Sequence, residues 1–99
     1  MKAFEAGWGG AVWKTIDHEP IVNVSSRYGS VDYDGRKIMG FNNIELISDR
    51  TLEVNLKEIR EVKRAFPDRA LVVSLMVESK RDRWHDMVKR VEDTGCDGL

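Results

Sequence analysis

The succession of an amphipathic helix and an apolar strand limits what this chain can fold into more than any other sequence feature. Apolar residues recur between positions 51 and 66 at the three- and four-residue spacings of one helix face. These residues are Leu52, Leu56, Ile59, Val62 and Phe66. Pro67 cannot continue the helix, and residues 70–77 follow as an almost uninterrupted apolar strand. Such strands are typical of parallel sheets that are covered on both faces.

The sequence before this helix is predicted to hold a first strand and a long connection. Residues 1–6 resemble the last turn of a helix that ends at Gly7, and residues 8–16 resemble a strand. Residues 18–40 are polar and irregular, with a short strand-like piece at 20–24 and a turn-rich section at 28–36. A connection of this length is often functional.

A second helix is predicted to follow the apolar strand, over residues 79–94. Ser79 and Asp82 resemble a capping box, and Gly95 suits the end of the helix. The apolar face of this helix is predicted to consist of Trp84, Val88 and Val91. Residues 96–99 resemble the opening of another strand.

This order of elements predicts an α/β fold with a parallel sheet and right-handed crossovers. About two and a half βα units would leave apolar strands with unpaired edges, which complete proteins avoid. We therefore expect residues 1–99 to be a fragment of one larger domain, a partial (β/α)8 (TIM) barrel. The alternative is a non-catalytic α/β module that pairs its open edges with another copy of itself.

Charge and cysteine content exclude several classes of function. The formal net charge is −1, so no broad basic surface is expected to attract nucleic acid or an anionic membrane. A single cysteine, Cys96, excludes an internal disulfide framework and a cysteine-cluster metal site. No apolar run is long enough to cross a bilayer, and the N-terminus lacks the apolar region of a secretory signal. A soluble protein of the cytoplasm is expected.

The ends of the predicted strands carry polar residues that suggest a site. In a (β/α)8 barrel, ligands gather at the carboxyl ends of the strands and on the loops that follow. Lys14 and Thr15 end the first strand, where a lysine suits an anionic cofactor or phosphate and a hydroxyl adds a hydrogen bond. The alternative is a lysine whose ammonium group reaches solvent while its stem covers the strand end.

A second polar group lies between residues 40 and 48, just before the clearest helix. The amides of Asn42 and Asn43 and the carboxylate of Glu45 could recognise the donor and acceptor edge of a heterocycle. The alternative is turn and capping duty, for which asparagine is common. Ser48, Asp49 and Thr51 offer oxygens to cap the helix.

The other reactive residues are assigned structural roles. His18 and His85 are expected at the surface, and they do not form a metal-ligand spacing with each other. Met39, Met76 and Met87 are expected in the core or in the lining of a pocket, and Cys96 is expected to be buried. No nucleophile with a neighbouring base is recognisable, so no catalytic residue is assigned.

Several motifs in this order resemble the dihydropyrimidine dehydrogenases. They are Ala6-Gly7-Trp8-Gly9-Gly10, Lys14-Thr15, Asn23-Val24-Ser25, Phe41-Asn42-Asn43-Ile44-Glu45-Leu46-Ile47-Ser48, Phe66-Pro67-Asp68 and Ser74-Leu75-Met76. More narrowly, the chain is similar to the FMN-binding barrel of these enzymes, which is related to the dihydroorotate dehydrogenases. A dihydroorotate-type substrate is therefore a second alternative.

The resemblance implies an activity and roles for four residues. That family reduces the 5,6 double bond of uracil or thymine with electrons from NAD(P)H, relayed through iron–sulfur clusters and flavin by way of a partner domain or subunit. Lys14 and Thr15 match residues that contact FMN. Asn43 matches an asparagine that binds the pyrimidine, and Glu45 lies in the same substrate-facing segment. A homo-oligomer is also expected.

The chain departs from the family in two respects. The family has Asn-Val-Ser-Pro-Arg where this chain has Asn23-Val24-Ser25-Ser26-Arg27. The family's catalytic cysteine belongs to a Cys-Pro motif that follows a strand start like residues 95–99, and that motif is absent from this sequence. Cys96 stands where a small residue is usual. The 99-residue chain alone is therefore expected to be inactive.

Overall fold

A parallel pair of strands forms the centre of the fold in the computed structural model, which describes residues 1–22, 28–41 and 47–99. The strands are β1 (Gly10–Ile16) and β4 (Ala70–Leu75), and their register runs from Gly10 opposite Ala70 to Ile16 opposite Leu75. Helix α2 (Leu52–Ala65) connects back to β4. The predicted α/β class and the parallel pairing are confirmed.

The predicted opening of a further strand is also confirmed on the other edge of β4. Gly98 forms a parallel bridge with Val72, and the Val73 amide donates to the Gly98 carbonyl at 2.9 Å. The described residues therefore contain one complete βαβ unit and the beginning of the next. A closed barrel remains a prediction.

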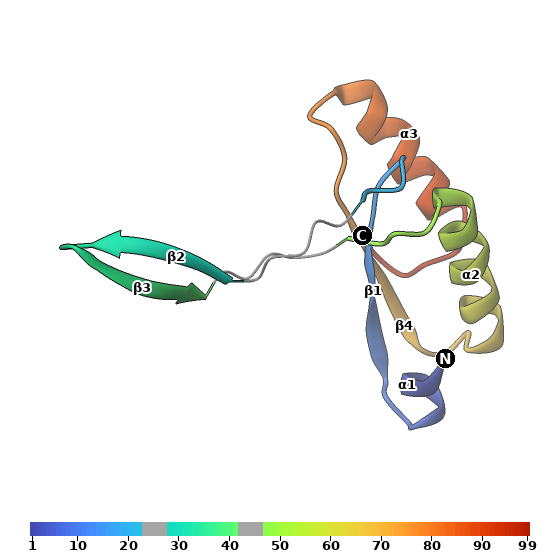
Figure 1. Cartoon of the computed structure of the whole chain (residues 1–99). Helices are drawn as coiled ribbons and strands as arrows, with labels where there is room; N and C mark the ends of the chain where they lie inside the picture. The colour runs from blue at the N-terminus through green and yellow to red at the C-terminus, as the bar shows by residue number, and fades with distance from the viewer. Residues whose placement is uncertain (23–27, 42–46) are drawn as a thin grey trace.

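Helices cover one face of this sheet and leave the other open (Figure 1). Helix α3 (Arg81–Glu92) lies beside α2, and the short α1 (Lys2–Glu5) lies near the start of β1. The core between helices and strands consists of Phe4, Ile16, Leu52, Leu56, Ile59, Leu71, Val73, Met87 and Val91. On the open face Val12 of β1 is 68% exposed and Val72 of β4 is half-buried, so the two-sided burial expected of the strand at 70–77 is confirmed on one face only.

The main helix follows the sequence pattern closely. Of its predicted apolar face, Leu52, Leu56 and Ile59 are buried, and Val62 and Phe66 are half-buried against the same core. The Thr51 hydroxyl accepts a hydrogen bond from the Val54 amide at 3.4 Å. Gly7 and Gly95, expected to end the flanking helices, have φ values of 92° and 81°. Glycine adopts this left-handed conformation without the steric cost of a Cβ atom.

A β-hairpin replaces the turn-rich connection that the sequence predicted. Strand β2 (Tyr28–Tyr33) pairs antiparallel with β3 (Arg36–Phe41), and Figure 1 shows the hairpin standing away from the two layers. Its turn is formed by Asp34 and Gly35, which both have positive φ, as a two-residue hairpin turn requires. Residues 20–22 are not in a strand, and residues 23 and 24 lie outside the described part.

The predictions for the second helix need correction. Helix α3 begins at Arg81 after Lys80, which makes no side-chain capping bond, so the capping box at Ser79 was wrong. Trp84 is 39% exposed and does not join the core, whereas Met87 and Val91 are fully buried. Only the α3 side chains that lie over the strands are in the core, and none of the residues in the first turn of α3 is among them.

The prediction that three methionines lie in the core or line a pocket is confirmed for one of them. Met87 is in the core, but Met39 is 68% exposed on the hairpin and Met76 is 46% exposed after β4. Among the described residues, no helix is long and apolar enough to cross a membrane.

Candidate functional site

The carboxyl ends of β1 and β4 carry three polar residues, two of which are in contact. The register shifts between Trp13 and Ile16, so that Lys14 and Thr15 lie opposite a single residue of β4, Ser74. The hydroxyls of Thr15 and Ser74 hydrogen-bond at 2.9 Å, and Thr15 is only 8% exposed. Such irregularities are common next to active sites, because the extra residue re-aims side chains.

Lys14 lies beside a groove along the outer edge of β1. Its side chain is exposed, and it lines a cavity of about 540 Å³ together with Val12, Trp13, Ser48 and Arg50. This volume is within the range of small-molecule sites. The predicted pair Lys14 and Thr15 therefore lies at the expected strand end, with one residue accessible and the other buried.

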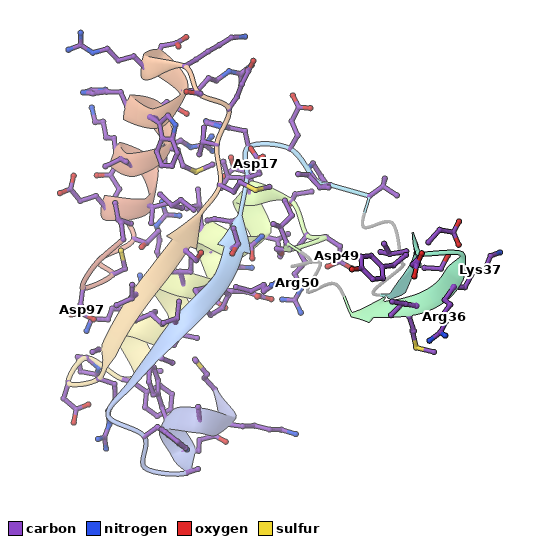
Figure 2. The ribbon with its side chains drawn as sticks, turned by 90° about the vertical axis from the view of Figure 1, so that its left-hand side faces the viewer. Asp17, Arg36, Lys37, Asp49, Arg50 and Asp97 are labelled. Atoms are coloured by element: carbon purple, nitrogen blue, oxygen red, sulfur yellow. The ribbon has the colours of Figure 1, made fainter. Side chains whose placement is uncertain are left out.

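The segment before α2 is attached directly to this strand end. The Ser48 amide donates to the Thr15 carbonyl at 2.8 Å, and the neighbouring Ile47 is 7% exposed. Asn42, Asn43 and Glu45 lie outside the described residues, so their predicted roles stay predictions. The structure does describe the point at which the chain leaves that segment, next to Thr15. In Figure 2, Asp49 and Arg50 mark this part of the chain.

Asn55 is the residue that sequence reasoning missed. It is 2% exposed in the first turns of α2, and its Oδ1 accepts from the Trp13 indole nitrogen at 3.1 Å. Its Nδ2 lies within hydrogen-bond distance of Ser48 Oγ and of the carbonyls of Arg50 and Thr51, at 3.2, 3.3 and 3.1 Å. The sequence signal that could have identified Asn55 was a polar residue next to Leu56, within the apolar face of the helix.

His18 is less exposed than predicted. Its side chain is 12% exposed, and its Nε2 lies 3.2 Å from Asp86 Oδ2 on α3. It lines a smaller cavity of about 270 Å³ with Glu78 and Arg83. His85 is exposed, as predicted. Within the described residues, no group of three or more histidine, cysteine or acidic side chains could hold a metal ion.

Cys96 is half-buried, so the expectation of a buried cysteine is met only in part. Its Sγ donates to the Val91 carbonyl at 3.6 Å, at the end of α3.

A charged cluster lies at the opposite ends of the strands. Lys63 Nζ donates to both carboxylate oxygens of Asp97, at 2.8 and 2.7 Å, and to the carbonyls of Pro67 and Arg69. Asp97 also accepts from the Leu71 amide at 2.8 Å. The hydrogen bond from Lys63, with that from Leu71, lowers the pKa of the Asp97 carboxyl. Figure 2 shows Asp97 at the end remote from Asp17.

This cluster lies at the amino end of β4, where polar contacts contribute to stability. It joins the C-terminus of α2, the start of β4 and the residue before the next strand. In parallel α/β units, ligands bind at the carboxyl ends of the strands, whereas polar contacts at the amino ends serve stability. The candidate site therefore consists of Lys14, Thr15 and Ser74, with the anchored segment at Ser48.

The chain is similar over nearly its whole length to known pyrimidine-metabolising proteins. It is 42% identical over 105 residues to "Dihydropyrimidine dehydrogenase (NADP(+)), chloroplastic" of Arabidopsis thaliana, a match that covers 99% of this chain and 25% of that protein. It is 35% identical over 96 residues to "NAD-dependent dihydropyrimidine dehydrogenase subunit PreA" of Escherichia coli strain K12, covering 97% of this chain and 23% of that protein. No protein-family model matches the chain.

These matches confirm the resemblance to dihydropyrimidine dehydrogenases that the sequence motifs indicated. The chain spans about a quarter of the length of these curated relatives. Both relatives are named as NAD(P)-dependent dehydrogenases, which are oxidoreductases.

Proposed function

We propose that residues 1–99 are part of the FMN-binding (β/α)8 barrel of a dihydropyrimidine dehydrogenase, which reduces the 5,6 double bond of uracil or thymine with electrons from NAD(P)H. The observation that carries this proposal is the contact between Thr15 and Ser74 at the carboxyl ends of two parallel strands, next to the exposed Lys14. The similarity to two dihydropyrimidine dehydrogenases over 97–99% of this chain supports it.

The residues at the strand ends fit a flavin chemically. The exposed ammonium group of Lys14 is a donor suited to the carbonyl oxygens and anionic forms of an isoalloxazine ring. The hydroxyls of Thr15 and Ser74 bond to each other, and each can still accept or donate one further hydrogen bond. When bound, FMN supplies the hydride chemistry, and the protein groups hold and orient it.

The substrate is assigned to the segment that precedes Ile47. In this proposal Asn43 binds the donor and acceptor edge of the pyrimidine, and Glu45 orients it from the same segment. The bond from the Ser48 amide to the Thr15 carbonyl supports this, because Ser48 follows that segment closely in the sequence and Thr15 is a proposed FMN residue. A dihydroorotate-type ring is the competing substrate.

The supply of electrons to the flavin requires a further domain or subunit. We assign NAD(P)H and iron–sulfur clusters to a partner domain or subunit, and the name of the E. coli relative as a subunit supports a multi-part enzyme. A homo-oligomeric assembly and a location in the cytoplasm remain part of the proposal, although the Arabidopsis relative is named as chloroplastic.

The test is substitution of Lys14 by alanine in the complete enzyme that carries this segment. We expect Lys14→Ala to lose most of its FMN, because a charge-assisted hydrogen bond contributes about 1.5–3 kcal/mol, or roughly 10- to 100-fold in affinity. Flavin absorbance of the purified protein and reduction of uracil and orotate are measured together. Preferred reduction of orotate would identify the competing substrate.

The matched control is Lys57→Ala, which removes an exposed lysine that pairs with Glu61 at 3.9 Å on the solvent face of α2. This variant should keep wild-type flavin content. Full flavin content in Lys14→Ala would refute the role of Lys14, and absence of FMN and of pyrimidine reduction in the wild type would refute the function.

A self-associating module is the second candidate, favoured by the open face of the sheet. Val12 is 68% exposed there, and among the described residues β1 pairs with a single strand, β4. Large exposed apolar areas and free strand edges promote pairing with another chain. Light scattering after size exclusion decides: a monodisperse dimer of the 99-residue chain favours this candidate, and an aggregating or monomeric chain does not.

A further inference from the structure

The β-hairpin leaves large apolar side chains exposed on both of its strands. Strands β2 and β3 form a two-stranded sheet of their own, and Figure 1 shows it standing away from the layers of helices and strands. Residues 30–39 are all exposed, and the fractions for Val31, Tyr33, Ile38 and Met39 are 58%, 70%, 48% and 68%. A two-stranded hairpin is at best marginally stable in water, so another strand or layer is expected to complete this one.

The two free edges of the hairpin differ in charge. Strand β3 carries Arg36 and Lys37 in succession, and both are labelled on the hairpin in Figure 2. Cationic side chains, lysine above all, hinder an edge strand from pairing with another chain. Strand β2 carries one charged residue, Asp32, between Val31 and Tyr33. The edge of β2 is therefore the one that remains open to a further strand.

The turn fixes which backbone groups of β2 face this edge. The residues that flank a two-residue turn are hydrogen-bonded to each other, and bonded and non-bonded pairs then alternate along the two strands. Counting back from the turn at Asp34 and Gly35, Asp32 and Ser30 fall at non-bonded positions. Their N–H and C=O groups therefore point away from β3, towards the free edge.

The sequence of β2 is complementary to itself in one register. When two copies run antiparallel with Val31 opposite Val31, Ser30 lies opposite Asp32 and Gly29 lies opposite Tyr33, on both sides of the centre. The outward backbone groups of Ser30 and Asp32 then meet, and the serine hydroxyl can donate to the carboxylate. The Tyr33 ring covers Gly29, which leaves room for another chain because it has no side chain.

The other pairings of this edge are poorer. Moving the centre of the register to Asp32 places two carboxylates directly opposite each other, which destabilises a sheet. Moving it to Ser30 leaves Tyr33 beyond the end of the opposing strand. Pairing β2 with β3 of another copy does not close, and it would generate an open array of hairpins and not a dimer.

We propose that the edge of β2 joins a second copy of this chain, giving a four-stranded antiparallel sheet across a twofold axis at Val31. The same residues meet on both sides of such an interface, so the assembly closes as a dimer. This inference does not rest on the proposed function, and it concerns a different surface from the open face of β1 and β4. It gives the expected homo-oligomer a defined contact.

The first test is Val31→Lys in the complete protein that carries this segment. Two lysines would then face each other across the axis, and we expect the dissociation constant of the dimer to rise at least about tenfold. Light scattering over a concentration series measures this constant. The matched control is Ile38→Lys, because Ile38 lies opposite Val31 on β3 and is also exposed. The same charge then lies away from the joined edge, and the constant should change no more than about twofold.

Disulfide trapping supplies a second measurement. The Cα atoms of directly opposed residues in antiparallel strands are about 4.5–5.5 Å apart, within the range that a disulfide spans. Val31→Cys should therefore form a covalent dimer under mild oxidation. The two Ile38 residues would be three strand spacings apart, about 14 Å, so Ile38→Cys should behave as the wild type does. If Val31→Lys does not fold, this cross-link decides.

Weakened association in Val31→Lys and a covalent dimer in Val31→Cys would support the interface. A monomeric wild type would overturn it, and so would equal weakening by Val31→Lys and Ile38→Lys, because the contact would then be a face of the hairpin. A dimer that persists in Val31→Lys, with no cross-link in Val31→Cys, would show that another part of the complete protein covers the hairpin. Flavin content and uracil reduction of the same samples test the proposed function separately.

Discussion

At the scale of single residues, the polar side chains with most partners are those that connect segments far apart in the sequence. Lys63 and Asp97 are 34 residues apart, and Trp13 and Asn55 are 42 residues apart. Each pair satisfies backbone groups as well as each other, which is how partly buried polar groups avoid the cost of desolvation. The first pair stabilises the amino ends of the strands, and the second supports the candidate site.

The Asp97 pair makes stability depend on pH. The hydrogen bond from Lys63 lowers the pKa of Asp97 below its ordinary value of 3.8 in the folded chain. A depressed carboxyl pKa contributes stability that is fully present above the unfolded pKa and is lost as pH falls through the folded pKa. We therefore expect Asp97→Asn to be less stable than wild type at neutral pH, and the difference to shrink below about pH 4.

Thermal unfolding at a series of pH values measures this difference. Asp68→Asn is the control, because Asp68 is an exposed carboxylate whose nearest cation, Arg69, is 3.8 Å away. A gap between wild type and Asp97→Asn that stays constant down to pH 2 would contradict the assigned role of the carboxylate.

At the scale of elements, the hydrophobic pattern predicted helices and strands correctly where it was regular along the whole element. The helix α2 spans 14 residues with a regular apolar face, and the six-residue β4 is apolar almost throughout. The hairpin was missed because neither strand has a regular apolar pattern: β2 reads Tyr-Gly-Ser-Val-Asp-Tyr and β3 reads Arg-Lys-Ile-Met-Gly-Phe, with a glycine inside each. The Asp34-Gly35 pair between them is a strong hairpin signal that outweighs the polar composition.

The N-cap of α2 offers a test at this scale. Thr51 accepts a hydrogen bond from the Val54 amide, one of the amides that has no partner within the helix. Thr51→Ala should lower the free energy of unfolding by about 1 kcal/mol, whereas Thr51→Ser, which keeps the oxygen, should remain close to wild type. Urea denaturation followed by circular dichroism measures both. Equal losses in the two variants would show that the hydroxyl does not cap the helix.

At the scale of the whole molecule, helices cover one face of the sheet and leave the other face exposed. Helices α2 and α3 cover one face, and Val12 and Lys14 are exposed on β1. This is the arrangement expected of adjacent units of a (β/α)8 barrel, whose inner face is filled by side chains from the other strands. The open face is also the feature that favours self-association.

The isolated 99-residue chain should therefore not reduce uracil or thymine, with or without added FMN. It contains the proposed FMN contacts Lys14 and Thr15, but no cysteine in a Cys-Pro motif to act as the acid. Absorbance of NAD(P)H in the presence of the chain, FMN and uracil measures this, with the complete enzyme as the positive control. Uracil-dependent oxidation by the isolated chain would show that the acid lies within these residues.

The sequence by itself determined the α/β class, the main helix, the parallel strands and the strand end that carries Lys14 and Thr15, because these depend on local periodicity and on chain order. Only the tertiary structure decided that Lys14 and Thr15 lie opposite Ser74, and that Asn55 joins Trp13 to Ser48. Strand register and side-chain contacts across 42 residues depend on how whole elements pack, which no local pattern encodes.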